Sequence, residues 1–80
     1  MPYIPLNDRA NIDLGAEPVT AGELNYALTQ VIRRYLRRGA GYQRYNDCIG
    51  ALEGAKLELY RRVVAPYEDR KRDENGEVYL

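Results

Sequence analysis

Apolar residues recur every three or four positions in two stretches of this 80-residue chain. Such spacing places the apolar side chains on one face of an α-helix. The first stretch contains Leu24, Ala27, Leu28, Val31, Ile32, Tyr35 and Leu36, and the second contains Tyr45, Cys48, Ile49, Leu52, Ala55, Leu59, Tyr60 and Val63. The pattern predicts a mainly all-α fold built on helices at about 21–38 and 42–65.

Local signals set the ends of these two helices. Thr20 and Glu23 have the spacing of a capping box, in which the threonine hydroxyl accepts a hydrogen bond from the glutamate N–H. Gly39 and Gly41 end the first helix, because glycine adopts the left-handed conformation that closes many helices. Since the connection is short, we expect the two helices to form an antiparallel helical hairpin.

We expect less regular structure at the two ends of this single domain. Residues 1–19 contain three prolines, which interrupt both helices and strands, and the sequence therefore predicts an extended N-terminal arm. Pro66 cannot donate a backbone hydrogen bond, so a short separate helix is expected after it. Residues 77–80 alternate as in a short strand, which would pair with Tyr3 and Ile4 of the arm.

The small size of the chain favours self-association. A domain of this length buries only about 60–65% of the surface that its unfolded chain exposes, and small proteins compensate with disulfides, metals or partner subunits. Cys48 is the only cysteine and histidine is absent, which excludes an internal disulfide and disfavours a zinc site. We therefore expect a homo-oligomer that needs no metal and no cofactor.

No targeting or membrane segment is evident in the sequence. The N-terminal residues lack the basic region and the apolar run of a signal peptide, and no stretch approaches the roughly 20 apolar residues of a membrane span. A lone thiol suits a reducing compartment. The expectation is a soluble cytoplasmic protein.

Charge is distributed unevenly, although the formal net charge is zero. Residues 24–46 contain five arginines and no acidic residue. A neutral chain is a poor general binder of nucleic acid, because that binding depends on neutralising many phosphates. The arginine block nevertheless suits a small anion or an acidic protein surface.

The sequence contains no pattern of a catalytic centre. Histidine and serine are both absent, which removes the usual general base and every Ser-His or Cys-His nucleophile pair. No phosphate-binding glycine loop is present, and Cys48 lies on the apolar stripe, as is typical of an ordinary buried thiol. We expect a protein that is not an enzyme.

Lys56 lies near the middle of the apolar stripe of the second helix. Burying an unpaired ammonium group costs several kcal/mol, so this side chain must reach water, pair with a carboxylate or bind an anion. One interpretation is an edge lysine paired with an acid such as Glu23 or Glu53. The other is a lysine that binds an anionic ligand.

A second face of the same helix carries two glycines one turn apart. Its residues are Gly50, Gly54, Leu57, Arg61 and Val64. Glycine inside a helix costs about 0.8–1 kcal/mol relative to alanine, so the pair suggests that another group approaches the backbone closely. We interpret this face as a helix contact, within the chain or between chains, with a ligand against the glycines as the alternative.

Tyrosine supplies all the aromatic residues of the chain, and several tyrosines neighbour arginines. A tyrosine that stacks and an arginine that forks onto phosphate are the elements of a nucleotide site. The candidates are Tyr26, Arg33, Arg37, Tyr42, Arg44 and Tyr45, joined by Lys56 for a second phosphate. A solvated basic face is the alternative interpretation.

Three segments carry a resemblance to a known family: residues 1–4 (MPYI), residues 22–26 (GELNY) and residues 49–71 (IGALEGAKLELYRRVVAPYEDRK). In these segments the chain resembles a family of short uncharacterised proteins of phages, prophages and bacteria. The resemblance implies a compact helical domain in a phage setting and no activity. Gly41 departs from the family pattern, in which a serine-type helix cap is more familiar.

Two hypotheses of function follow. The first is a non-enzymatic, homo-oligomeric phage protein that sequesters a small anionic nucleotide signal of bacterial defence; it rests on analogy with other small phage proteins. In that hypothesis Arg33, Arg37 and Arg44 contact phosphate, while Tyr26, Tyr42 and Tyr45 stack. The second is a structural or adaptor protein whose arginine block docks on an acidic host protein.

Overall fold

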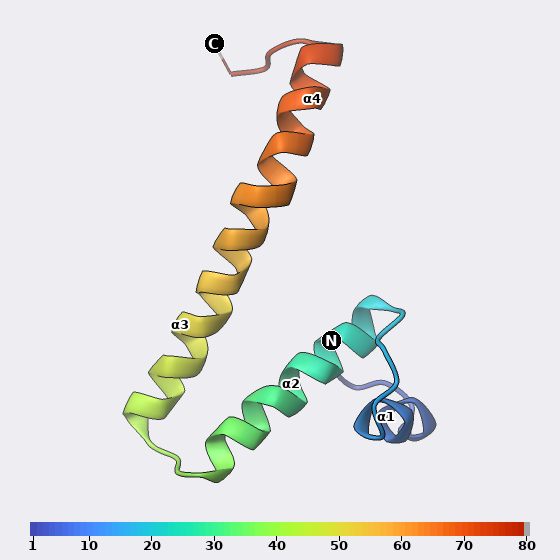
Figure 1. Ribbon diagram of the computed structural model, residues 1–80, viewed down its shortest axis with the longest axis vertical. Coiled ribbons are helices and arrows are strands. Elements are labelled where there is room, and N and C mark those ends of the chain that lie inside the picture. The colour runs from blue at the N-terminus through green and yellow to red at the C-terminus, as the bar shows by residue number, and fades with distance from the viewer. Residues whose placement is uncertain (80) are drawn as a thin grey trace. The chain divides into compact units, whose positions relative to one another are not determined.

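The computed structural model describes residues 1–79, and all the regular structure in that range is helical (Figure 1). Along the chain lie α1 (Leu6–Asp13), α2 (Ala21–Arg37), α3 (Tyr42–Leu59), the π-helical turn η1 (Tyr60–Val64) and α4 (Ala65–Asn75). Residues 1–45 form one compact unit, and a second unit begins at Asn46. The all-α prediction is confirmed, whereas the packing of the two long helices as a hairpin stays a prediction.

The capping box at the start of α2 is confirmed. The Thr20 hydroxyl accepts a hydrogen bond from the Glu23 N–H at 3.1 Å, and the Glu23 carboxylate accepts one from the Val19 N–H at 3.0 Å. The first bond satisfies a donor that the first turn of a helix leaves without a partner, and the second ties the helix to Val19, the residue before its cap. The local signal therefore placed this helix end within a residue.

The prediction of an extended arm over residues 1–19 is wrong, because residues 6–13 form α1. All three prolines lie outside this helix, and Pro5 occupies its N-terminal cap position with a φ of −54°, which suits a helix start. Gly15, at a φ of +107°, follows its C-terminal end. The Arg9 Nε also donates to the Ile4 carbonyl at 2.8 Å, which ties the first residues to α1.

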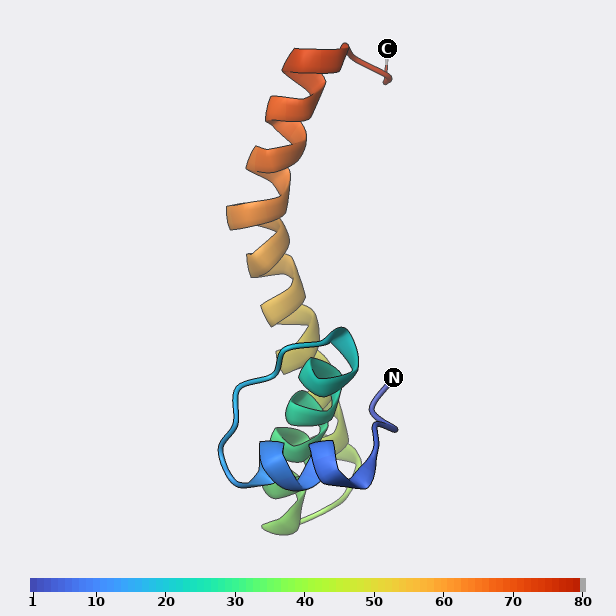
Figure 2. The same cartoon turned by 90° about the vertical axis from the view of Figure 1, so that its right-hand side faces the viewer.

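α1 packs against α2 (Figure 2), and its Asp13 contacts Tyr26 and Gln30, which lie off the apolar stripe of α2. Tyr26, predicted to stack on a ligand or to lie on a solvated basic face, is the one buried residue among those described, with 8% of its surface exposed. Leu24, Leu28 and Val31 on the apolar stripe are about half exposed, at 52%, 46% and 55%. Within residues 1–45, the apolar stripe of α2 therefore remains open.

Contrary to the prediction, Pro66 does not interrupt the helix: the backbone is helical from Tyr42 to Asn75 (Figure 1). The preceding turn η1 has π-helical hydrogen bonding, with the Ala65 N–H donating to the carbonyl of Tyr60, five residues back. Proline lacks an N–H, and its ring clashes with the carbonyl four residues earlier. The wider π turn just before Pro66 accommodates the proline, so the second helix extends ten residues beyond its predicted end.

The predicted terminal strand is absent from residues 76–79, and residues 3 and 4 are not in a strand either; Leu80 lies outside the described residues. Gly76, at a φ of +100°, ends α4. The Glu77 carboxylate accepts hydrogen bonds from the N–H groups of Val78 and Tyr79, at 3.1 and 2.8 Å. A local side-chain turn thus occupies the backbone donors that strand pairing would use.

Candidate functional site: the arginines of α2

A polar network joins α1 to α2 around Tyr26. The Tyr26 hydroxyl lies 2.9 and 3.0 Å from the two carboxylate oxygens of Asp13, and the Gln30 side-chain amide donates to the same carboxylate at 2.9 Å. Arg33 in turn donates to the Gln30 side-chain oxygen at 2.9 Å. The ring of Tyr26 is therefore held in a helix contact and is not presented for stacking on a ligand.

The network also shifts the acidity of its members. The hydrogen bond from Gln30, followed by that from Tyr26, lowers the pKa of Asp13. Burial, followed by the hydrogen bond to Asp13, raises the pKa of the Tyr26 hydroxyl. Near neutral pH, Asp13 is consequently an acceptor and Tyr26 a donor, which is the protonation pattern that the hydrogen bonds require.

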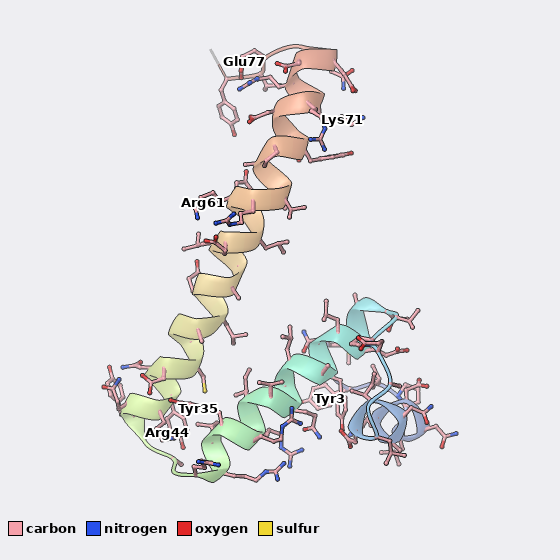
Figure 3. All side chains as sticks on the ribbon, in the orientation of Figure 1. Tyr3, Tyr35, Arg44, Arg61, Lys71 and Glu77 are labelled. Carbon is pink, nitrogen blue, oxygen red and sulfur yellow. The ribbon has the colours of Figure 1, made fainter. Side chains whose placement is uncertain are left out.

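Arg44, a predicted phosphate ligand, caps the C-terminal end of α2. Its guanidinium carbon lies 3.9 Å from the centre of the Tyr35 ring, and its Nη2 donates to the Tyr35 backbone carbonyl (Figure 3). This carbonyl is among the last four of α2, which lack a partner within the helix. Arg44 therefore fixes the connection between α2 and α3, and its Nε is buried with no hydrogen-bond acceptor.

The last turns of α2 carry three arginines that lie outside any ion pair in residues 1–79, although the charge of Arg34 contributes to lowering the pKa of Asp13. We define the arginine cluster as Arg34, Arg37 and Arg38, which are exposed. Within residues 1–79, none of the three forms an ion pair or a side-chain hydrogen bond. Three cations at a helix C-terminus interact favourably with the helix dipole, so their position is locally stable without any carboxylate partner.

Residues 46–79 show the opposite arrangement, because most of their cations pair with an acid one turn away. Lys56 lies 3.5 Å from Glu53, and Arg61 and Arg62 both bind Glu58. Lys71 and Glu74 are 3.2 Å apart, and Arg72 lies 3.7 Å from Asp69. The hydrogen bonds from Arg62 and then from Arg61 lower the pKa of the Glu58 carboxyl group.

Lys56 is an edge lysine paired with an acid, which was the plainer of its two interpretations. Its ammonium group pairs with Glu53, and 73% of its side chain is exposed. Tyr42 and Tyr45, at 81% and 51% exposed, also lie at the surface. Of the seven residues predicted to form a nucleotide site, only Arg37 belongs to the arginine cluster. The other two members, Arg34 and Arg38, were not predicted as ligands.

A hollow of about 430 Å³ lies beside α4 and the tail that follows it. Glu68, Asp69, Lys71, Arg72 and Glu77 are among its lining residues. Arg72 is 3.8 Å from Glu77 and 3.7 Å from Asp69, so the charges of the hollow largely compensate one another. This pattern offers less to a charged ligand than the arginine cluster does.

Residues 1–79 contain neither a metal-binding cluster nor a membrane-spanning helix. No group of three or more cysteine or acidic side chains in that range is arranged to hold a metal ion. No helix of the described chain combines the length and apolar character needed to cross a bilayer. The arginine cluster thus remains the strongest candidate for binding.

Comparison with known families identifies the family to which the chain belongs. It matches the model of a domain of unknown function, DUF6899, over residues 1–78, and it therefore belongs to that family. No curated protein sequence and no solved structure matches the chain.

Proposed function

We propose that this member of the DUF6899 family is a non-enzymatic adaptor that docks on an acidic protein surface through the arginine cluster. The observation that carries the proposal is the contrast in charge pairing. Arg34, Arg37 and Arg38 have no ion-pair partner in residues 1–79, whereas most cations of residues 46–79 are paired within their own helix.

The shape of the cluster favours a protein partner over a small ligand. At 100° per residue, the three side chains are spread over about a quarter to a third of the circumference of α2. They border the apolar stripe of α2, where Val31 is 55% exposed. A convex face of charge beside apolar area suits an acidic amphipathic surface, since apolar contact supplies affinity and charge supplies orientation.

Sequestration of a nucleotide is less well supported. Four of the seven predicted ligands already have partners in this chain, namely Tyr26 with Asp13, Arg33 with Gln30, Arg44 with Tyr35 and Lys56 with Glu53. A nucleotide site would need these side chains to release their partners and converge. In the phage setting that the family resemblance implies, the acidic partner would be a host protein met in the cytoplasm.

The test compares two variants that each lose three positive charges. R34Q/R37Q/R38Q removes the arginine cluster, and R70Q/K71Q/R72Q removes three cations of α4 as the matched control. Binding of a fluorescein-labelled polyglutamate peptide is followed by anisotropy, and helicity by circular dichroism. We expect the cluster variant to bind about tenfold more weakly than the control, because each exposed ion pair contributes about 0.2–1 kcal/mol.

Parallel titrations distinguish the other functions. Equal affinity of the two variants for the peptide contradicts the proposal. A saturable heat with cyclic or linear nucleotides, without peptide binding, replaces the adaptor by nucleotide sequestration. Binding of duplex DNA that falls steeply between about 50 and 200 mM salt would indicate a nucleic-acid binder instead.

A further inference from the structure

One row of side chains along α2 changes from apolar to basic. Leu24, Ala27, Val31, Arg34 and Arg38 recur at alternating three- and four-residue spacing, which places them on one side of the helix. We define these five residues as the mixed row. Leu24 and Val31 are 52% and 55% exposed, and both arginines are exposed. The mixed row is therefore apolar near the start of α2 and positively charged at its C-terminal end.

The helix α1 leaves the mixed row uncovered. It contacts α2 through the hydrogen bond between Asp13 and Tyr26, and Tyr26 lies about 100° around the helix from the middle of the row. Arg34 and Arg38 lie outside any ion pair in residues 1–79. Exposed apolar area that adjoins unpaired charge is typical of a surface that docks a partner.

The distribution of charge selects the direction of a helical partner. A row with this spacing accepts the side chains of a second helix, since helices pack ridge into groove. Acidic residues are most favourable in the first turn of a helix and cations in the last, because of the helix dipole. A helix antiparallel to α2 thus brings its favoured acidic turn to Arg34 and Arg38, whereas a parallel helix brings its favoured basic turn.

The other helices of this chain do not meet both requirements. The first turn of α3 has no acidic residue and carries Arg44. α1 and α4 have Asp8 and Glu68 in their first turns, but neither helix gathers its apolar residues on one side. α2 itself has Glu23 there, whose carboxylate already accepts a hydrogen bond from the Val19 N–H. The best complement to the mixed row is therefore a helix of another protein.

The glycine-containing face that begins in α3 offers less to an acidic helix. This face, predicted as a helix contact, contains Gly50, Gly54, Leu57, Arg61 and Val64. A Cβ atom on either glycine would meet no atom of residues 46–79 within 4 Å, so that part of the chain makes no close approach to them. Arg61, the charged residue of this face, binds Glu58. The contact predicted here stays a prediction.

We propose that the partner of the arginine cluster is an amphipathic α-helix of another protein, which lies antiparallel along the mixed row. Apolar residues of that helix contact Leu24 and Val31, and its acidic first turn contacts Arg34 and Arg38. The inference rests on the proposed adaptor function and adds the form and the direction of the partner.

Two synthetic peptides of identical composition test the direction. Both have the 17-residue length of α2 and leucines at alternating three- and four-residue spacing; glutamates fill the first turn of one and the last turn of the other, with glutamines at the opposite end. By fluorescence anisotropy, the wild-type chain is expected to bind the peptide with the acidic first turn about tenfold more tightly. In R34Q/R37Q/R38Q this preference should disappear, which separates it from any difference in helicity between the free peptides.

Two further measurements test the site itself. Val31→Gln should weaken binding of the preferred peptide about fivefold, while the matched control Val78→Gln, at a valine that is 85% exposed, should leave it unchanged. Circular dichroism checks that both variants stay helical. In amide spectra, a nitroxide on the N-terminus of the peptide should broaden the signals of residues 36–39, and one on its C-terminus those of residues 21–24.

The outcomes separate this inference from the proposed function. Equal or reversed preference for the two peptides, with both weakened in R34Q/R37Q/R38Q, overturns the inference and leaves the adaptor function intact. Equal binding of both peptides by the wild type and that variant contradicts the adaptor function as well. Unchanged binding by Val31→Gln shows that the row is covered within the chain. Sedimentation at twice the mass of 9.2 kDa, unaffected by either peptide, assigns the row to a second copy; both results overturn the inference.

Discussion

Replacing Arg44 by alanine should loosen the connection between α2 and α3 without unfolding either helix. The substitution removes the guanidinium group that lies 3.9 Å from the Tyr35 ring centre and its hydrogen bond to the Tyr35 carbonyl. Both contacts hold residues 38–41 in place from the α3 side. Arg44→Lys keeps the positive charge, but an ammonium group cannot stack on the ring and donate to the carbonyl at once.

The magnitude follows from the two contacts. A cation over an exposed aromatic ring contributes about 0.5–1 kcal/mol. A hydrogen bond from a charged donor contributes about 1.5–3 kcal/mol, and solvent exposure reduces this one toward or below the lower end. We therefore expect alanine to cost about 1–2 kcal/mol of local stability, and lysine to cost an intermediate amount.

Amide hydrogen exchange measures this local stability directly. The Gly39 N–H donates to the Leu36 carbonyl at 3.2 Å, and the Tyr45 N–H donates to the Gly41 carbonyl at 3.0 Å. In Arg44→Ala these amides should exchange about 5–30-fold faster. Arg37→Ala serves as the control, since Arg37 forms no ion pair and no side-chain hydrogen bond within residues 1–79. Equal protection of Gly39 and Tyr45 in both variants would refute the structural role of Arg44.

Three further predictions concern α1, the loop and η1. Docking of α1 on α2 depends on ionised Asp13, whose pKa lies below the ordinary aspartate value of about 3.9. The stability that Asp13 contributes is therefore complete above that value and is lost as the pH falls through the folded pKa. Amide spectra should show this loss as a transition, and Asp13→Asn should abolish it. Gly41→Ser should destabilise the protein by about 1–2 kcal/mol despite serine's preference for helix caps, because Gly41 has a φ of +138°. A lower thermal midpoint should report this loss of stability. Pro66→Ala restores a backbone donor and should replace η1 by α-helical hydrogen bonds, visible as a protected amide at position 66; an unprotected amide there would contradict the role assigned to the proline.

Elements with local signals were predictable from the sequence, and α1 was not. The N-terminal end of α2 depends on Thr20 and Glu23, which are neighbours in the chain. α1 is short and its apolar pattern is weak, so proline content dominated the interpretation of residues 1–19. The contact between α1 and α2 depends on Tyr26 and Asp13, a polar pair separated by 13 residues, and hydrophobic periodicity carries no signal for such a pair.

The candidate site was predictable as a region but not residue by residue. Composition alone located the arginine block, because no acidic residue interrupts residues 24–46. Which arginines remain available depends on contacts such as Arg44 with Tyr35 and Arg33 with Gln30. The assignment of the arginine cluster therefore needed the structure, as did the pairing of Lys56 with Glu53 rather than Glu23.

The π-helical turn at residues 60–64 also sets the rotational phase of α4. A π turn holds about one residue more than an α-helical turn, so every α4 side chain points about 100° away from where an uninterrupted α-helix would direct it. Removing one residue from this turn in a Pro66→Ala background would rotate the Lys71–Glu74 and Asp69–Arg72 pairs around the helix axis without breaking them. A change of one residue in the length of this turn would therefore redirect the outward face of the charged C-terminal helix while the helices on either side stay intact.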